Sequence, residues 1–188
     1  MKIICFFFTA RNCLKMAQSC LEIPSQIKDS FWVFVISSDM RLDSRNRCSE
    51  SIDMVGKWML FLNKTEKIQG DKTLLDINWE KIRNLVETNQ LYSAKCSTGL
   101  ENPNANEPNT GVIIVYTKNY EDKADVKRAA DLIIKSLDYK AFIYYKTDQA
   151  TLSGQYSKST NKRVSLYRHS YEGEFSESIG KNWKVLND

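Results

Sequence analysis

The sequence has few of the residues that build metal sites and disulfide frameworks. It holds a single histidine and five widely spaced cysteines, and no two of the cysteines form a C-x-x-C element. An odd, scattered set of this kind argues against a disulfide framework, and the missing paired elements argue against a zinc site. We therefore expect a cytoplasmic protein, kept in a reducing compartment, with no metal and no cofactor.

Long hydrophobic runs are also absent. The apolar run near the start, residues 3–10, ends at Arg11 and is far shorter than the roughly 20 residues that a membrane span requires. It lacks a clear small-x-small cleavage site, which disfavours a cleaved secretory signal. We interpret residues 1–25 as an N-terminal segment, either disordered or an edge strand, and we expect no membrane partner.

Charge of one sign is not in large excess. The 188 residues include 27 Lys and Arg against 23 Asp and Glu, and the resulting net charge of +4 is scattered along the chain. This balance allows an anionic partner without identifying one. With 42% hydrophobic residues and no internal repeat, the chain is long enough for one core but cramped for two. We therefore predict a single domain over residues 26–188.

What the sequence does contain is a series of short strand patterns with two helical patterns between them. Runs rich in β-branched and aromatic residues predict strands at 31–36, 57–62, 93–97, 111–117, 141–146 and 164–168. The polar stretch 37–53 predicts a long loop. Apolar residues at helical spacing predict one helix between Asp76 and Leu91 and another after Asp122. Because the connection from the first helix to the next strand is so short, we expect an α+β fold: an antiparallel sheet with helices packed on one face.

Several residues have predicted structural roles. We expect Asp76 or Asn78 to cap the first helix and Asp122 to cap the second, because each offers a side-chain oxygen to free backbone amides. Trp58 and Trp79 lie on apolar-patterned elements, which predicts that both belong to the core.

Five segments follow one another along the chain in a recognisable order. They are 56–60 (GKWML), 79–82 (WEKI), 94–98 (AKCST), 112–117 (VIIVYT) and 145–156 (YKTDQATLSGQY). Together they resemble the basophilic-leukaemia-expressed protein family, which is similar to a distant branch of the initiation factor 4E fold. The resemblance covers about residues 31–168, and it implies a curved antiparallel sheet with helices on one face and a binding surface on the concave face.

The resemblance also allows a comparison with the cap-binding branch of that fold. Those proteins clamp a methylated guanine between two loop tryptophans and hold the phosphates with Arg and Lys. Here Trp32 and Trp58 resemble strand tryptophans of the fold instead. The position of the phosphate Arg falls near Ser97 or Thr98, and that of the next phosphate Lys falls near Val112. The resemblance therefore implies ligand binding without the standard cap-binding residues.

The resemblance further raises phosphothreonine-lyase chemistry. That reaction needs a Lys base to take the α-proton and an acid, commonly His, to protonate the leaving phosphate. The one histidine, His169, lies near the end of the last predicted strand, outside the matching segments.

Polar residues recur on or just after the strands of the matching segments. If the sheet brings the strand ends together, three lysines would face one concavity and could hold a phosphate or another oxyanion. The predicted ligand-binding set is Lys57, Lys95, Ser97, Thr98, Lys146, Asp148, Thr151 and Tyr156.

Each member of this set has a predicted role. The lysines would contact the anion, and Ser97 and Thr98 would donate hydrogen bonds. Asp148 would orient a lysine, and Tyr156 would stack on the ligand or cap it. The alternative is that the lysines only occupy the solvent face of a half-covered sheet, where alternation calls for polar residues in any case.

These observations leave three functions open. The leading hypothesis is a binding domain for a phosphorylated ligand, a nucleotide or an RNA end, on the concave sheet face. The second is an enzyme that acts on a phosphorylated or nucleotide substrate, for example by phosphothreonine-lyase-like chemistry. The third is a protein-interaction module that binds a partner protein through its helical face.

Overall fold

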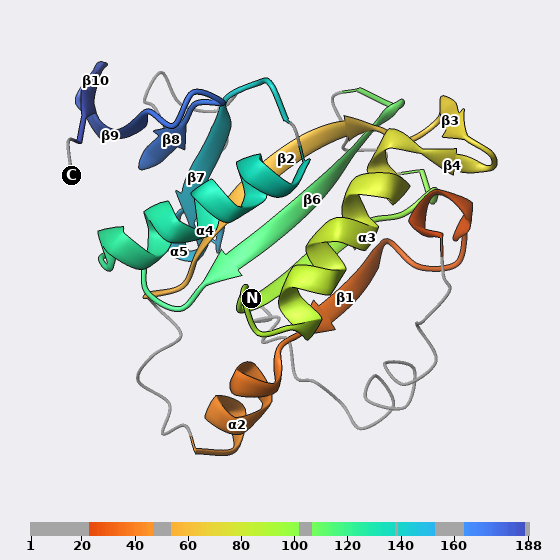
Figure 1. Ribbon diagram of the computed structural model, residues 1–188, viewed down its shortest axis with the longest axis horizontal. Helices are drawn as coiled ribbons and strands as arrows, with labels where there is room; N and C mark the ends of the chain where they lie inside the picture. The colour runs from red at the N-terminus through yellow and green to blue at the C-terminus, as the bar shows by residue number, and fades with distance from the viewer. Residues whose placement is uncertain (1–22, 47–53, 102–106, 138, 153–163, 187–188) are drawn as a thin grey trace.

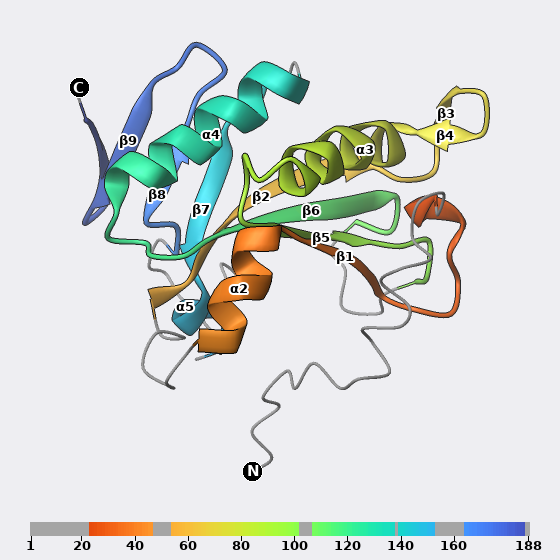
Figure 2. The same ribbon diagram turned by 60° about the horizontal axis from the view of Figure 1, so that its bottom comes forward.

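An antiparallel sheet forms the centre of the molecule, and two long helices cover one of its faces (Figures 1 and 2). The computed structural model describes residues 23–46, 54–101, 107–137, 139–152 and 164–186. The two helices are α3 (Leu74–Glu87) and α4 (Lys123–Leu137). None of the described helices is both long and apolar enough to cross a membrane. Residues 1–22, most of the predicted N-terminal segment, lie outside the described residues.

The main sheet has eight strands, and every neighbouring pair within it is antiparallel. Their order across the sheet is β1 (Trp32–Ile36), β5 (Ser93–Ser97), β6 (Thr110–Thr117), β2 (Gly56–Asn63), β7 (Ile143–Thr147), β8 (Tyr167–His169), β9 (Phe175–Ile179) and β10 (Asn182–Val185). A small hairpin, β3 (Lys67–Gln69) with β4 (Lys72–Thr73), leads into α3. The predicted α+β class with an antiparallel sheet is confirmed.

Alternation along the strands separates a core face from an open face. On β2, Trp58, Leu60 and Leu62 are buried toward the helices, and the indole nitrogen of Trp58 donates a hydrogen bond of 3.0 Å to the Val126 carbonyl of α4. Trp79 of α3 is also buried, so the prediction that Trp58 and Trp79 belong to the core is confirmed. The remaining β2 side chains point to the sheet face opposite α3 and α4, which we call the open face.

The stretch 37–53 was predicted to be one long loop, and this is wrong for its first part. Residues 38–46 form helix α2 (Ser38–Asn46). Its start is fixed by Ser37, whose hydroxyl oxygen accepts the amide hydrogen of Met40 at 3.1 Å, as an N-cap does. The segment is polar with little apolar periodicity, so the pattern did not indicate a helix. Residues 47–53 lie outside the described residues.

The capping prediction for α3 also needs correction, whereas that for α4 is confirmed. Thr73 caps α3: its hydroxyl accepts the Asp76 amide hydrogen, and the Asp76 carboxylate accepts the Thr73 amide hydrogen at 2.8 Å. Asp76 is therefore the third residue of a capping box, one turn inside the helix. For α4, the Asp122 carboxylate accepts the Asp125 amide hydrogen at 3.1 Å, as predicted.

Candidate functional site

Three lysines from three strands meet on the open face. Lys57 of β2 stands directly opposite Lys146 in the pairing of β2 with β7. The ammonium groups of Lys57 and Lys95 lie 5.9 and 5.7 Å from the ring centroid of Tyr116, which projects from β6 between their two strands. The sheet thus brings together the three predicted lysines, which we call the lysine cluster (Lys57, Lys95 and Lys146).

Two of these lysines are almost completely shielded from water. Lys57 is 5% exposed and Lys146 is 6% exposed. A buried ammonium group is costly unless it is paired with an opposite charge. Asp148 meets part of this need, because its Oδ1 lies 2.5 Å from the Lys57 nitrogen. Asp148 is the first residue of the short helix α5 (Asp148–Leu152), which directly follows β7.

The electrostatics of the cluster favour an added negative charge. Burial, with a further contribution from the charge of Lys57, lowers the pKa of Lys95 from 10.5 to about 8, and Asp148 opposes this only in part. Burial, followed by the charge of Lys57, also lowers the pKa of Lys146, and Asp148 again opposes the shift. Both shifts show that the ammonium forms are destabilised where they lie. An anion bound here would relieve that destabilisation.

Two aromatic residues of this region were not among the predicted site residues. The Trp32 ring of β1 lies with its centroid 4.4 Å from the Lys95 nitrogen, on the other side of that lysine from Tyr116. Rings at such distances attract an ammonium group through their electron-rich faces. The signal was present in the sequence: the buried neighbours Val115 and Thr117 place Tyr116, by alternation, on the same face as the lysines.

Ser97 and Thr98, predicted as hydrogen-bond donors to a ligand, make structural contacts where β5 ends. The Ser97 hydroxyl oxygen accepts the Val112 amide hydrogen at 2.8 Å, one residue beyond the last paired residues of β5 and β6. The Thr98 hydroxyl is buried and donates to the Ser30 carbonyl. Thr98 comes three residues after Lys95, about 10 Å along an extended chain, so the two do not share one small site.

The last two members of the predicted set add no described side chain. Thr151 belongs to α5, but its side chain is not among the described ones, and Tyr156 lies outside the described residues. Among the described residues, no group of three or more His, Cys, Asp or Glu side chains is arranged to hold a metal ion.

The single histidine lies far from this chemistry, on the core face. His169 of β8 is buried, and its Nε2 lies 2.7 Å from Asp131 Oδ1 of α4. Its Nδ1 lies 2.8 Å from the Ser170 carbonyl oxygen. Because both ring nitrogens are engaged on the helix side of the sheet, His169 cannot deliver a proton to a ligand on the open face.

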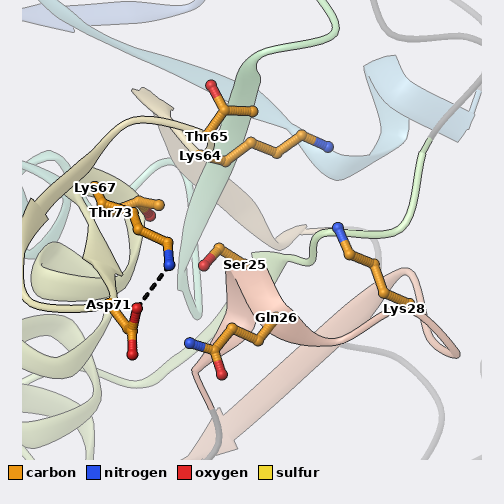
Figure 3. Close-up of a pocket in the computed structure, with 8 residues that line it drawn as sticks. All are labelled: Ser25, Gln26, Lys28, Lys64, Thr65, Lys67, Asp71 and Thr73. Carbon is orange, nitrogen blue, oxygen red and sulfur yellow. Dashed lines mark hydrogen bonds and ion pairs between the residues drawn. The ribbon is translucent and has the colours of Figure 1, made fainter.

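A pocket of about 490 Å³ opens at another part of the molecule (Figure 3). It is polar and includes three lysines, each of which already has a protein acceptor. The Lys28 nitrogen donates to the Gly99 carbonyl at 2.8 Å, and the Lys64 nitrogen lies 3.4 Å from the Thr98 carbonyl. Lys67 pairs with Asp71 at 2.6 Å, the dashed contact in Figure 3. No residue of the lysine cluster lines this pocket, so the two sites are separate.

Comparisons with solved structures found chains of similar fold. The chain is similar to schistosome eIF4E complexed with m7GpppA and 4E-BP, with a TM-score of 0.54, 12% sequence identity, and coverage of 86% of this chain and 82% of that one. It is also similar to C. elegans eIF4E-3 in complex with the 4E-binding protein Mextli and a cap analog, with a TM-score of 0.51, 10% identity, and coverage of 78% and 79%. At these identities the likeness shows the fold alone.

The sequence itself assigns the family. A comparison with curated proteins found no match. The model of the family described as basophilic leukemia-expressed protein Bles03 matches residues 46–152, which is more than half of the 188-residue chain. That match contains the strands and the short helix that carry the lysine cluster and Asp148. The chain belongs to the Bles03 family and has an eIF4E-like fold, as the five ordered segments implied.

Proposed function

We propose that this domain binds a phosphorylated ligand, a nucleotide or an RNA end, at the lysine cluster on the open face. The cluster would supply the positive charge, and the backing carboxylate of Asp148 would hold Lys57 in place until the ligand binds. The proposal keeps the expectation of a cytoplasmic protein. It assigns no cap-binding role to Trp58, which is buried against α4.

One observation carries the proposal: three ammonium groups from three strands converge on one small area of the open face, where the Asp148 carboxylate is bonded to Lys57. A solvated sheet face would let lysines point into water, where their charges cost little. Here two of the three are buried, and Lys95 has a pKa near 8. Proteins rarely bury cations in this way unless an anion compensates them.

The structural neighbours add support from outside the chain. The schistosome complex named above contains m7GpppA, which carries phosphates, and the C. elegans complex contains a cap analog. A shared fold does not transfer a site, so the proposal depends on the lysines of this chain and on none of the neighbours' residues.

A thermal-shift experiment tests the proposal. The ligands are inorganic phosphate, guanosine 5′-monophosphate, m7GpppG and, as a control, unphosphorylated guanosine. A ligand at about 100 times its Kd stabilises the native state by about 2.7 kcal/mol, which raises the Tm of a domain of this size by roughly 5–10 °C. We expect the phosphorylated compounds to raise the Tm and guanosine to leave it unchanged.

Matched lysine variants locate the binding site. Lys57→Met and Lys95→Met should each remove most of the shift, since each deletes a cluster cation while keeping the side-chain length. Lys81→Met is the control, because Lys81 is exposed on α3, on the helical side of the sheet. If all three variants respond to phosphate like the wild type, the ligand binds elsewhere and the proposal is wrong.

The same variants separate the two alternative functions. An enzyme would show turnover of a phosphorylated substrate that Lys95→Met abolishes, with a residue other than His169 as the acid. A protein-interaction module would ignore all phosphorylated compounds and bind a protein through α3 and α4. That alternative is supported by the structural neighbours that were solved in complex with a partner protein, 4E-BP or Mextli.

A further inference from the structure

A second group of side chains lies on the open face beside the lysine cluster. It consists of Phe142, Tyr144, Arg168 and Trp183, which we call the aromatic patch. The rings of Phe142 and Tyr144 are 6.5 Å apart, and those of Tyr144 and Trp183 are 6.2 Å apart, measured between centroids. The Arg168 guanidinium carbon lies 4.7 Å from the Phe142 ring centroid and 4.9 Å from that of Trp183.

Strand pairing shows that the patch and the cluster share one face. Tyr144 and Lys146 are two residues apart on β7, so their side chains project on the same side. Tyr144 stands opposite Met59 of β2 and opposite Arg168 of β8. Two residues along a strand span about 6.7 Å. The patch is therefore the next row of the sheet after the row that holds Lys57 and Lys146.

Two aromatic rings of the patch are exposed to solvent, where a sheet face with no binding role would be expected to bury them. Phe142 is 41% exposed and Tyr144 is 38% exposed, while the core face of the same strand buries Ile143 and Tyr145 completely. Among the described charged side chains of the cluster and the patch, positive charges prevail: Lys57, Lys95, Lys146 and Arg168 stand against Asp148 and Glu174. Glu174 holds the Arg168 guanidinium at 3.1 Å, which fixes it between its two rings.

We propose that the aromatic patch stacks a base of a single-stranded oligonucleotide whose phosphate occupies the lysine cluster. Exposed rings next to cations on a sheet face are the arrangement that single-stranded nucleic acids use, because every base offers a flat surface for stacking while the backbone follows the positive charge. A duplex keeps its bases stacked inside and cannot use the rings in this way. The inference rests on the proposed function and makes it specific: the ligand is a strand of two or more nucleotides.

A binding titration tests the inference with a phosphorylated sugar and a phosphorylated oligonucleotide. Ribose 5-phosphate has a phosphate but no base, so it measures the cluster alone, and 5′-phosphorylated tetrauridine measures the cluster together with the patch. We expect the tetranucleotide to bind at least tenfold more tightly, as one stacked base would provide. A 5′-phosphorylated duplex of the same length should gain nothing over ribose 5-phosphate.

Variants of one tyrosine identify the ring that stacks. Tyr144→Ala should reduce tetranucleotide binding to the level of ribose 5-phosphate and leave ribose 5-phosphate binding unchanged. Tyr144→Phe keeps the ring and should behave like the wild type, which a purely structural role of the hydroxyl would not allow. Tyr171→Ala is the matched control, because Tyr171 is also exposed but lies between β8 and β9, outside the patch. The Tm of each variant shows that it is folded.

The failures of the two proposals are distinguishable. If ribose 5-phosphate binds but the tetranucleotide binds no more tightly, the inference is overturned and the proposed function stands. The same holds if Tyr144→Ala keeps the full tetranucleotide advantage, or if the duplex binds as well as the single strand. If neither ligand binds, both proposals are overturned together.

Discussion

On the core face of β2 the fully buried Trp58 packs its ring against Tyr145, with centroids 5.0 Å apart, and donates a hydrogen bond to α4. On the open face its neighbour Lys57 is 5% exposed, and its burial is compensated by a single carboxylate. Both side chains are shielded from water, but only the first gains free energy from that shielding.

The difference separates what stabilises the fold from what the fold positions. Burial of apolar rings stabilises the native state, whereas burial of clustered ammonium groups opposes it and is expected where charge has a use. The two faces should therefore respond to mutation in opposite ways. Substitutions on the core face should lower stability, and substitutions of the open-face lysines should change ligand binding with small or even favourable effects on stability.

The largest effect is expected on the core face. Trp58→Ala should lower the free energy of unfolding by about 3–5 kcal/mol, because it leaves a cavity beside Tyr145 and α4. Trp183→Ala is the control: this half-buried ring lies on the open face, and its loss should cost about 1 kcal/mol or less. Urea unfolding of both variants measures the contrast. Equal losses would show that the two faces contribute alike to stability.

How far the sequence predicts this fold depends on how completely a strand is buried. The strongly apolar runs at β2 and β6 were located to within a residue or two, since most of their side chains are buried. β9 and β10 were missed because polar residues dominate β9 and exposed residues dominate β10, and their turn depends on Gly180, which has a φ of +60°. For such strands, pairing with a neighbour determines the structure more than local pattern does.

The site was predictable in part, for a related reason. The strand segments placed Lys57, Lys95 and Lys146 on one face through alternation, but adjacency in sequence misled for Thr98, which lies beyond the end of β5. The aromatic patch joins β7, β8 and β10, so it exists only through strand order, which no single segment encodes. Whether these residues bind a ligand stays a prediction until it is measured.

A smaller effect tests the role of Asp148. The shift of Tm on adding phosphate should change in opposite directions in Asp148→Asn and Lys57→Met. Asp148→Asn removes the carboxylate that compensates Lys57, so the free energy of unfolding should fall by about 1–3 kcal/mol. The shift of Tm on adding phosphate should grow, because the anion then replaces the negative charge that Lys57 has lost. Lys57→Met should instead shrink that shift and change stability by less than about 1 kcal/mol, since Asp148 keeps two other lysines nearby.

Thermal melts with and without phosphate measure both signs. A smaller phosphate response in both variants would mean that Asp148 itself helps to hold the ligand, and the view of Asp148 as a competing counter-charge would be wrong. Lys57→Met is the control for Asp148→Asn, because it removes the other partner of the same ion pair.

The smallest expected effect is a pH dependence of stability that comes from Lys95. Its pKa in the folded protein is about 8, lowered mainly by burial and then by Lys57, against 10.5 in the unfolded chain. Between these values the unfolded state binds more protons, so the free energy of unfolding should rise with pH across this window. The cost of the charged form applies below pH 8 and is relieved above it. Relative to Lys95→Met, which has no group to titrate, the wild type should gain about 1–2 kcal/mol between pH 7 and 9.5. Urea unfolding of both proteins at the two pH values gives this difference. If the free energy of unfolding changes with pH by the same amount in both proteins, Lys95 is as well solvated as a surface lysine and the open face carries no electrostatic cost.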